Sequence, residues 1–188
     1  MLRSIVVGCC VLFSVSFFSQ DFIGDISGKM VENDFLGEFI WRFEKGKTLY
    51  ILEFEMEHEE HRIEITFDGD TTAQVEIYEE GVLTDQRPFT PSQLKKEVLV
   101  VSRDSDKGPE LLSFSTEQHE IRTDDREIVT YLADISVNWN GADHFFTQDV
   151  PFALSCEHKG KFPLKIKATD LKGELKYSFI VETIKEKG

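Results

Sequence analysis

Residues 52–70 read LEFEMEHEEHRIEITFDGD, and their apolar and acidic side chains alternate with a period of two. Leu52, Phe54 and Met56 are apolar, and a glutamate follows each of them. This alternation indicates a β-strand with one dry face and one wet face. The apolar positions then change from even to odd numbers, and the change across HEEH predicts a tight turn or a bulge. The stretch therefore predicts two antiparallel strands that meet near Glu59.

The same alternation recurs along the chain after residue 25. Phe39, Trp41 and Phe43 share one face of the segment GEFIWRFEKGK, and the segment REIVTYLADISVNWNG is strand-like as far as Trp139. Turn signals separate these segments at Lys45-Gly46, Asp68-Gly69, Glu80-Gly81, Asn140-Gly141 and Lys172-Gly173. The pattern predicts an all-β fold: a single antiparallel curved sheet or half-barrel, a meander, with one or two short helices.

One helix has a clear local signal. In TPSQLKKE, Thr90 is a suitable N-cap, Pro91 suits the first helical position and Gln93 is the capping-box partner. The helix is short because the following residues are β-like. We expect the later segment RDSDKGPE to form a loop.

The N-terminus is typical of a secretory signal. Residues 1–20 contain one charge, Arg3, followed by an apolar stretch and small or polar residues. That stretch is too short to span a membrane, which takes about 20 residues. We therefore predict a cleaved signal peptide at residues 1–20, one β-rich domain at residues 21–188, and a periplasmic or extracellular location. VVGC loosely resembles a lipoprotein box ending at Cys9, but only eight residues precede this cysteine.

Charge and cysteine content narrow the possible partners. The formal charge is −14, and loss of Arg3 leaves 20 basic residues against 35 acidic ones, a charge of −15. Such a field repels nucleic acid and anionic lipid surfaces. Cys156 would be the one cysteine left, so no internal disulfide is expected. Its thiol is either a small buried hydrophobe or a free reactive group.

Two groups of residues resemble metal sites. His58 and His61 are three residues apart, one short of the HExxH spacing of zinc proteases, so they form either a metal site or a solvated hairpin tip. Asp104, Asp106 and Glu110 resemble the start of a calcium loop, but the full EF-hand pattern is absent. We expect no cofactor, and no nucleophile motif supports an enzyme.

Aromatic side chains suggest a different kind of site. Apolar residues of the early strands share faces that would line the inside of a curved sheet: Phe39, Trp41, Phe43, Phe54 and Met56. Open barrels enclose apolar cavities, so this face is a candidate for binding an acyl chain. The alternative is that these side chains form an ordinary solid core.

The order of features resembles the LolA/LolB-like secreted half-barrels and their uncharacterised bacterial relatives. The resemblance rests on GKFPLKIKATDLKGELKYSFIVETI at residues 160–184 and on GKMVENDFLGEFIWRFEKGKTLYILEFE at residues 28–55. It implies a half-barrel whose concave face binds lipid or a lipidated protein. The strongly acidic early hairpin departs from what docking to a membrane would require.

Three functions follow as expectations. The first is a non-enzymatic secreted protein that binds an apolar or lipid-like ligand in its concave face. The second is a protein-interaction or adhesion module that uses an exposed sheet edge or the acidic face of Glu53, Glu55 and Glu57. The third is a metal-dependent secreted enzyme that uses His58 and His61.

Overall fold

The computed structural model describes residues 21–33, 35–69, 72–89, 100–142, 150–158 and 160–187. The strands and the helix are β1 (Gly24–Glu32), β2 (Phe35–Glu44), β3 (Lys47–Met56), β4 (Glu59–Phe67), β5 (Ala73–Glu79), β6 (Val82–Phe89), β7 (Val100–Lys107), β8 (Thr116–Thr123), β9 (Arg126–Ala133), α2 (Val150–Cys156), β10 (Phe162–Asp170) and β11 (Leu175–Glu186). All eleven strands form one antiparallel sheet, which confirms the predicted fold class. The predicted signal peptide and the helix expected from Thr90 lie outside the described residues.

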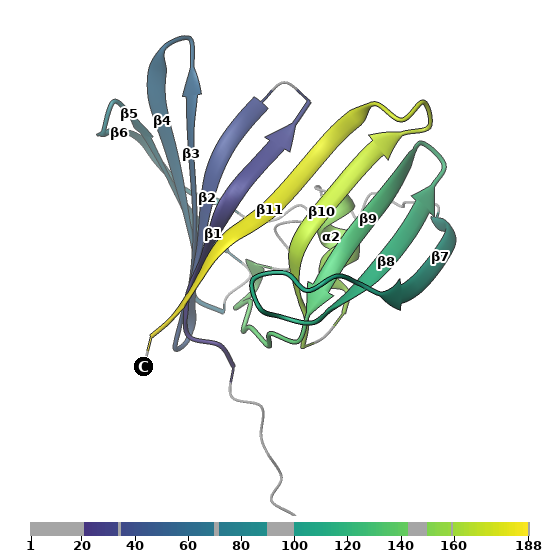
Figure 1. The fold of residues 1–188 in the computed structure, drawn as a ribbon. Helices are drawn as coiled ribbons and strands as arrows, with labels where there is room; N and C mark the ends of the chain where they lie inside the picture. The colour runs from purple at the N-terminus through teal and green to yellow at the C-terminus, as the bar shows by residue number, and fades with distance from the viewer. Residues whose placement is uncertain are drawn as a thin grey trace, which may run out of the picture.

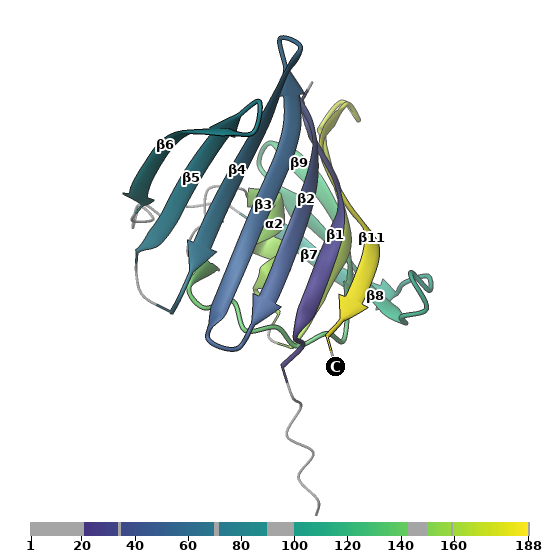
Figure 2. The ribbon, with the colours of Figure 1, turned by 90° about the vertical axis from the view of Figure 1, so that its left-hand side faces the viewer.

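The sheet consists of two runs of neighbouring strands joined in the middle. Its order is β6-β5-β4-β3-β2-β1-β11-β10-β9-β8-β7, so β1 pairs with β11 and links the two runs. β6 and β7 follow one another in the chain yet form the two outer edges of the sheet. The sheet curves strongly, and α2 lies inside the curve (Figures 1 and 2). Strand twist accumulated over many strands produces this curvature.

A glycine allows the two runs to meet. The register between β1 and β11 shifts after Ser27, leaving Glu182 of β11 as the extra residue of a bulge. A Cβ atom at Gly28 would lie 1.9 Å from the carbonyl oxygen of Ile180. Only a residue without a side chain permits this approach of the two backbones.

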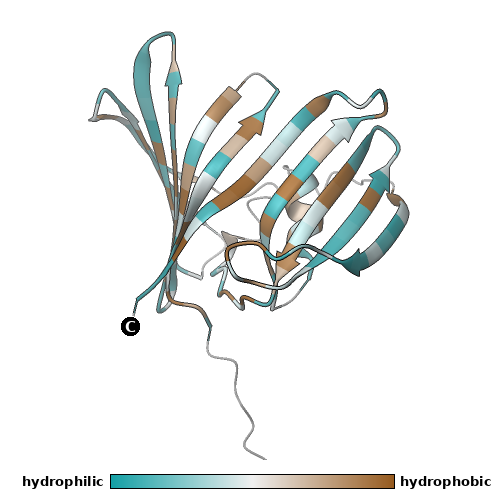
Figure 3. Cartoon of the chain, in the orientation of Figure 1, coloured by the Kyte–Doolittle hydropathy of each residue, from teal (hydrophilic) through white to brown (hydrophobic). Residues whose placement is uncertain are grey.

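The period-two pattern separates the two faces of the sheet. Brown and teal bands alternate along β1, β2, β10 and β11 in Figure 3. On the concave face of β2, Phe39, Trp41 and Phe43 are almost completely buried, as their shared parity predicted. β10 and β11 contribute further concave side chains, among them Ile166 opposite Phe179. The core therefore lies inside the curve.

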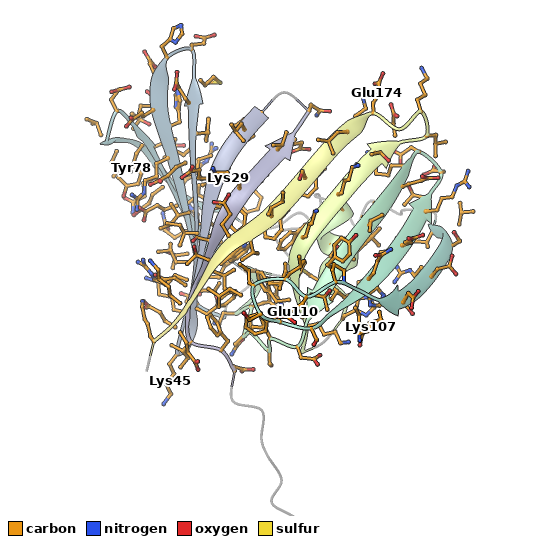
Figure 4. All side chains as sticks on the ribbon, viewed as in Figure 1. Lys29, Lys45, Tyr78, Lys107, Glu110 and Glu174 are labelled. Atoms are coloured by element: carbon orange, nitrogen blue, oxygen red, sulfur yellow. The ribbon has the colours of Figure 1, made fainter. Side chains whose placement is uncertain are left out.

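The turns confirm most of the glycine signals. Lys45-Gly46 and Glu80-Gly81 are two-residue hairpin turns. Figure 4 labels Lys45 in the first of these turns and Glu174 in the β10–β11 turn, at the opposite end of the sheet. The β3–β4 turn is formed by Glu57 and His58, both with positive φ (56° and 73°). This is the geometry of a type I′ turn, which favours asparagine and glycine. The turn thus lies slightly before the predicted position, since β4 already begins at Glu59.

Two local predictions are wrong. The expected loop RDSDKGPE contains most of β7, because Arg103 to Lys107 pair with β8. Tertiary pairing here overrides the low strand propensity of aspartate at positions 104 and 106. The strand predicted to reach Trp139 ends at Ala133, and the chain then leaves the sheet and returns to the concave side.

Candidate functional site

Helix α2 and the segment after β9 fill one part of the concave side. The ring of Phe152, on α2, lies 6.0 Å from that of Trp41 and 5.2 Å from that of Phe179. Trp139 packs edge-on against Trp41, with ring centroids 5.2 Å apart. The Thr48 hydroxyl donates a hydrogen bond of 2.8 Å to the backbone oxygen of Asn138. This part of the concave side is therefore a solid aromatic core.

The remaining part is hollow. A cavity of about 390 Å³ lies on the concave side between α2, β11 and β1–β6, and its size is typical of ligand sites. Its lining residues come from seven strands and the helix: Met30, Trp41, Tyr50, Leu52, Ile63, Ile65, Val75, Ile77, Arg87, Phe89, Phe152, Tyr177 and Phe179. Apolar side chains dominate this lining, so its surface favours an apolar guest over water.

Exposure along β3 shows where the concave side opens. Thr48 and Tyr50 are buried, Leu52 and Phe54 are half-buried, and Met56 is 53 % exposed. The concave row of β3 therefore becomes more accessible towards the β3–β4 turn.

The five residues predicted as an apolar binding face lie in three different environments. Trp41 lines the cavity. Phe39 and Phe43 belong to the solid core, where Phe39 stacks on Phe179 with centroids 4.2 Å apart. Phe54 is half-buried against Phe35, and Met56 is exposed. Of this predicted set, one member contributes to the cavity wall.

Sequence reasoning missed most of the lining. Val75 and Ile77 alternate with Gln74 and Glu76 in the sequence, but nothing local indicates that β5 faces a cavity. Phe152 was missed because its contacts with Trp41 and Phe179 join residues far apart in the chain. These positions become a site only when the sheet curves around them.

Polar groups at the cavity are few. Among the described residues that line it, Arg87 alone carries a formal charge. Arg87 lies on the edge strand β6, opposite Val75, and its side chain is 63 % exposed. Its Nε lies 3.4 Å from a carboxylate oxygen of Asp85, which is also solvent-accessible. Deeper in the wall, the Tyr50 hydroxyl donates to the Met30 sulfur at 3.5 Å.

The two predicted histidines occupy a hairpin end. His58 is in the turn with its side chain 99 % exposed, and its Nδ1 lies 3.6 Å from a Glu55 oxygen. His61 stacks against Phe54 with centroids 5.3 Å apart. Within the described parts of the chain, no three His, Cys, Asp or Glu side chains are grouped so that they could hold a metal ion.

The predicted calcium ligands also lie on the surface. Asp104 and Asp106 are exposed positions of β7, and a carboxylate oxygen of Asp106 accepts a 2.7 Å bond from the backbone N–H of Lys107. Glu110 follows β7 in the loop labelled in Figure 4. Asp104 and Asp106 thus belong to an extended strand and not to a loop that could wrap around an ion.

The acidic face formed by Glu53, Glu55 and Glu57 is partly neutralised by an arginine. Glu53 accepts a 3.1 Å hydrogen bond from Arg62, which also pairs with Glu64. Glu55 is exposed and adjacent to His58, while Glu57 is in the turn. This face is the solvent side of the hairpin, as predicted.

A polar cluster anchors the end of α2. The rings of His119, on β8, and His158 lie 4.4 Å apart, and Arg103 forms a 2.8 Å hydrogen bond with Glu157. Burial is the main cause that lowers the pKa of His158, and the positive charges of His119 and Arg103 lower it further. Glu117 accepts hydrogen bonds from Lys161 and His119, which lower the pKa of its carboxyl group. These contacts connect the residues after α2 to β7 and β8.

No protein-family model matches this chain, and no curated protein matches it either. Of the architecture expected from the resemblance to LolA/LolB-like proteins, the antiparallel meander is present, and it forms one eleven-stranded sheet. In the described part of the chain, no helix has the length and apolar character needed to span a membrane.

Proposed function

We propose that this protein is a non-enzymatic, secreted binding protein that holds an apolar or lipid-like ligand in the concave cavity, as LolA/LolB-like half-barrels do. The observation that carries the proposal is the cavity of about 390 Å³ and its nearly uniform apolar wall. The signal-like residues 1–20 support a periplasmic or extracellular location.

The size of the cavity sets the scale of the ligand. A methylene group is about as large as a water molecule, which takes ~30 Å³ of liquid volume. The cavity therefore accommodates roughly a dozen methylenes. At about 0.8 kcal/mol per buried methylene, ten of them contribute about 8 kcal/mol before the entropic cost of association. That gain is sufficient for reversible binding without hydrogen bonds along the chain.

The test compares a variant that fills the cavity with a control variant that carries the same substitution on the outer face of the sheet. Leu52→Trp places a larger side chain into the cavity, whereas Leu36→Trp makes the same change on the opposite face of β2, where Leu36 is 61 % exposed. We expect delipidated wild type and Leu36→Trp to bind the neutral apolar dye N-phenyl-1-naphthylamine. Added 1-dodecanol should displace the dye from both proteins. Leu52→Trp should lose most of this binding while retaining the wild-type circular dichroism spectrum.

Two outcomes contradict the proposal. One is delipidated wild type that binds neither the dye nor 1-dodecanol. The other is folded Leu52→Trp protein that binds both as tightly as Leu36→Trp does.

A further inference from the structure

We infer that the cavity selects single-chain amphiphiles whose head group is an anion, a carboxylate or a phosphate, and that Arg87 pairs with that head group. The inference rests on the proposed function, because it names the ligand class of the same cavity. It goes beyond apolar binding by assigning a polar contact and a ligand orientation.

The placement of Arg87 is the first argument. β6 presents Asp85, Arg87 and Phe89 on its concave side, opposite Ile77, Val75 and Ala73 of β5. Phe89 and Arg87 both line the cavity, so the wall changes from aromatic to cationic along one strand. Its side chain is 63 % exposed, so Arg87 lines the cavity while much of the side chain remains in water. Through the ladder Tyr50–Ile65–Val75–Arg87, this charge lies level with the buried Tyr50, so a chain in the cavity would meet it at the solvent-exposed β6 edge of the sheet.

The pairing of Arg87 is the second argument. Its contact with Asp85 is a 3.4 Å pair between two solvent-accessible groups, and such pairs are weak. The remaining guanidinium N–H groups form a planar fork that suits a carboxylate or phosphate. A ligand anion can therefore bind without breaking a buried interaction.

The charge of the surroundings opposes an anionic ligand and makes Arg87 necessary for binding one. The protein carries a formal charge of −14, and Asp85 lies beside Arg87. Long-range electrostatics thus disfavour an anionic ligand, so selectivity for one depends on the local cation. Replacing Arg87 would leave Asp85 as the nearest charge on the concave side of β6.

The volume of the cavity is the third argument. About 390 Å³ suits one chain of roughly a dozen methylenes but not two chains of membrane-lipid length. The inferred ligands are therefore a medium-chain fatty acid or a single-chain alkyl phosphate.

The experiment compares three head groups on one chain length: dodecanoate, dodecyl phosphate and 1-dodecanol. Each displaces the neutral dye from wild type, Arg87→Gln and Arg122→Gln at a pH where the carboxylate is ionised. Arg122 is an exposed arginine of β8 that does not line the cavity, so its variant is the control for net charge. We expect Arg87→Gln to weaken the binding of dodecanoate or dodecyl phosphate by about two- to fivefold. Binding of 1-dodecanol should stay unchanged, and Arg122→Gln should behave as wild type.

The outcomes separate this inference from the proposed function. An effect on dodecanoate alone supports a fatty acid, and an effect on dodecyl phosphate alone supports a phosphate ester. If Arg87→Gln leaves the binding of both anions unchanged, or weakens the binding of 1-dodecanol equally, the inference of an anionic head group is wrong. The proposed binding of an apolar ligand would then still stand. If wild type binds none of the three ligands, the proposed function itself fails.

Discussion

Phe152 of α2 stacks on Trp41 of β2, with ring centroids 6.0 Å apart and ring planes 16° from parallel. Both rings line the cavity and both are buried. Because α2 lies mainly against β9 and β10, this pair connects the helix to the opposite part of the curved sheet. The aromatic stack therefore forms the boundary between the solid core and the hollow half of the concave side.

Removing the ring of Phe152 should lower the stability of the protein and enlarge the cavity. We expect Phe152→Ala to lower the free energy of unfolding by about 3–5 kcal/mol, the usual cost of deleting a buried phenylalanine ring. Urea denaturation measures the loss. Phe54→Ala, at a half-buried position on β3, serves as the matched control and should cost less. Equal losses in the two variants would contradict the role assigned to the stack.

The pairing of β1 with β11 should not tolerate a side chain at Gly28. The added Cβ of Gly28→Ala meets the backbone of Ile180, which a rotamer change cannot relieve. We expect a loss of about 1–3 kcal/mol in the free energy of unfolding. Ser27→Ala, one residue away on the same strand, should remain within about 0.5 kcal/mol of wild type in the same urea titration. A Gly28→Ala protein of unchanged stability would show that the bulge adjusts freely.

The β3–β4 turn should gain from residues that favour positive φ. Glu57 and His58 both occupy this region, where non-glycine residues are strained. The double variant Glu57→Asn, His58→Gly should raise the free energy of unfolding by about 1 kcal/mol, after allowing for the greater flexibility of glycine when unfolded. Denaturation in urea reports the gain. A loss of stability would mean that the native pair makes interactions that offset its strain.

The cluster around His158 should make stability depend on pH. The pKa of His158 is lowered from its ordinary value of 6.5, so the unfolded chain takes up the proton before the folded chain does. Stability is therefore highest above this ordinary value and falls as the pH drops through it towards the lower folded-state pKa. The groups that shift this pKa are His119, Arg103, Glu157 and Lys161.

We expect the urea midpoint to decrease between about pH 7.5 and about pH 5.5, and His158→Gln to flatten that decrease. His58→Gln, which alters an exposed histidine at the hairpin tip, should leave the decrease in place. A pH profile that His158→Gln does not change would assign the dependence to other groups.

Much of the fold follows from short-range patterns. Alternation at Phe39, Trp41 and Phe43 indicated their shared face, and glycine-containing pairs such as Lys45-Gly46 marked the turns. These features depend on neighbours in the chain, because strand geometry directs successive side chains to opposite faces. The part of β7 from Arg103 to Lys107 was missed because its ladder with β8, and not its composition, makes it a strand.

The sequence by itself determined that this protein is an antiparallel sheet with one apolar and one polar face, since that property repeats every two residues. Only the tertiary structure decided which apolar residues fill a core and which enclose a cavity. Phe39 and Trp41 share a strand and a face, yet Trp41 alone of the two lines the cavity. The difference depends on where α2 and the segment after β9 pack, and those contacts join residues about a hundred positions apart.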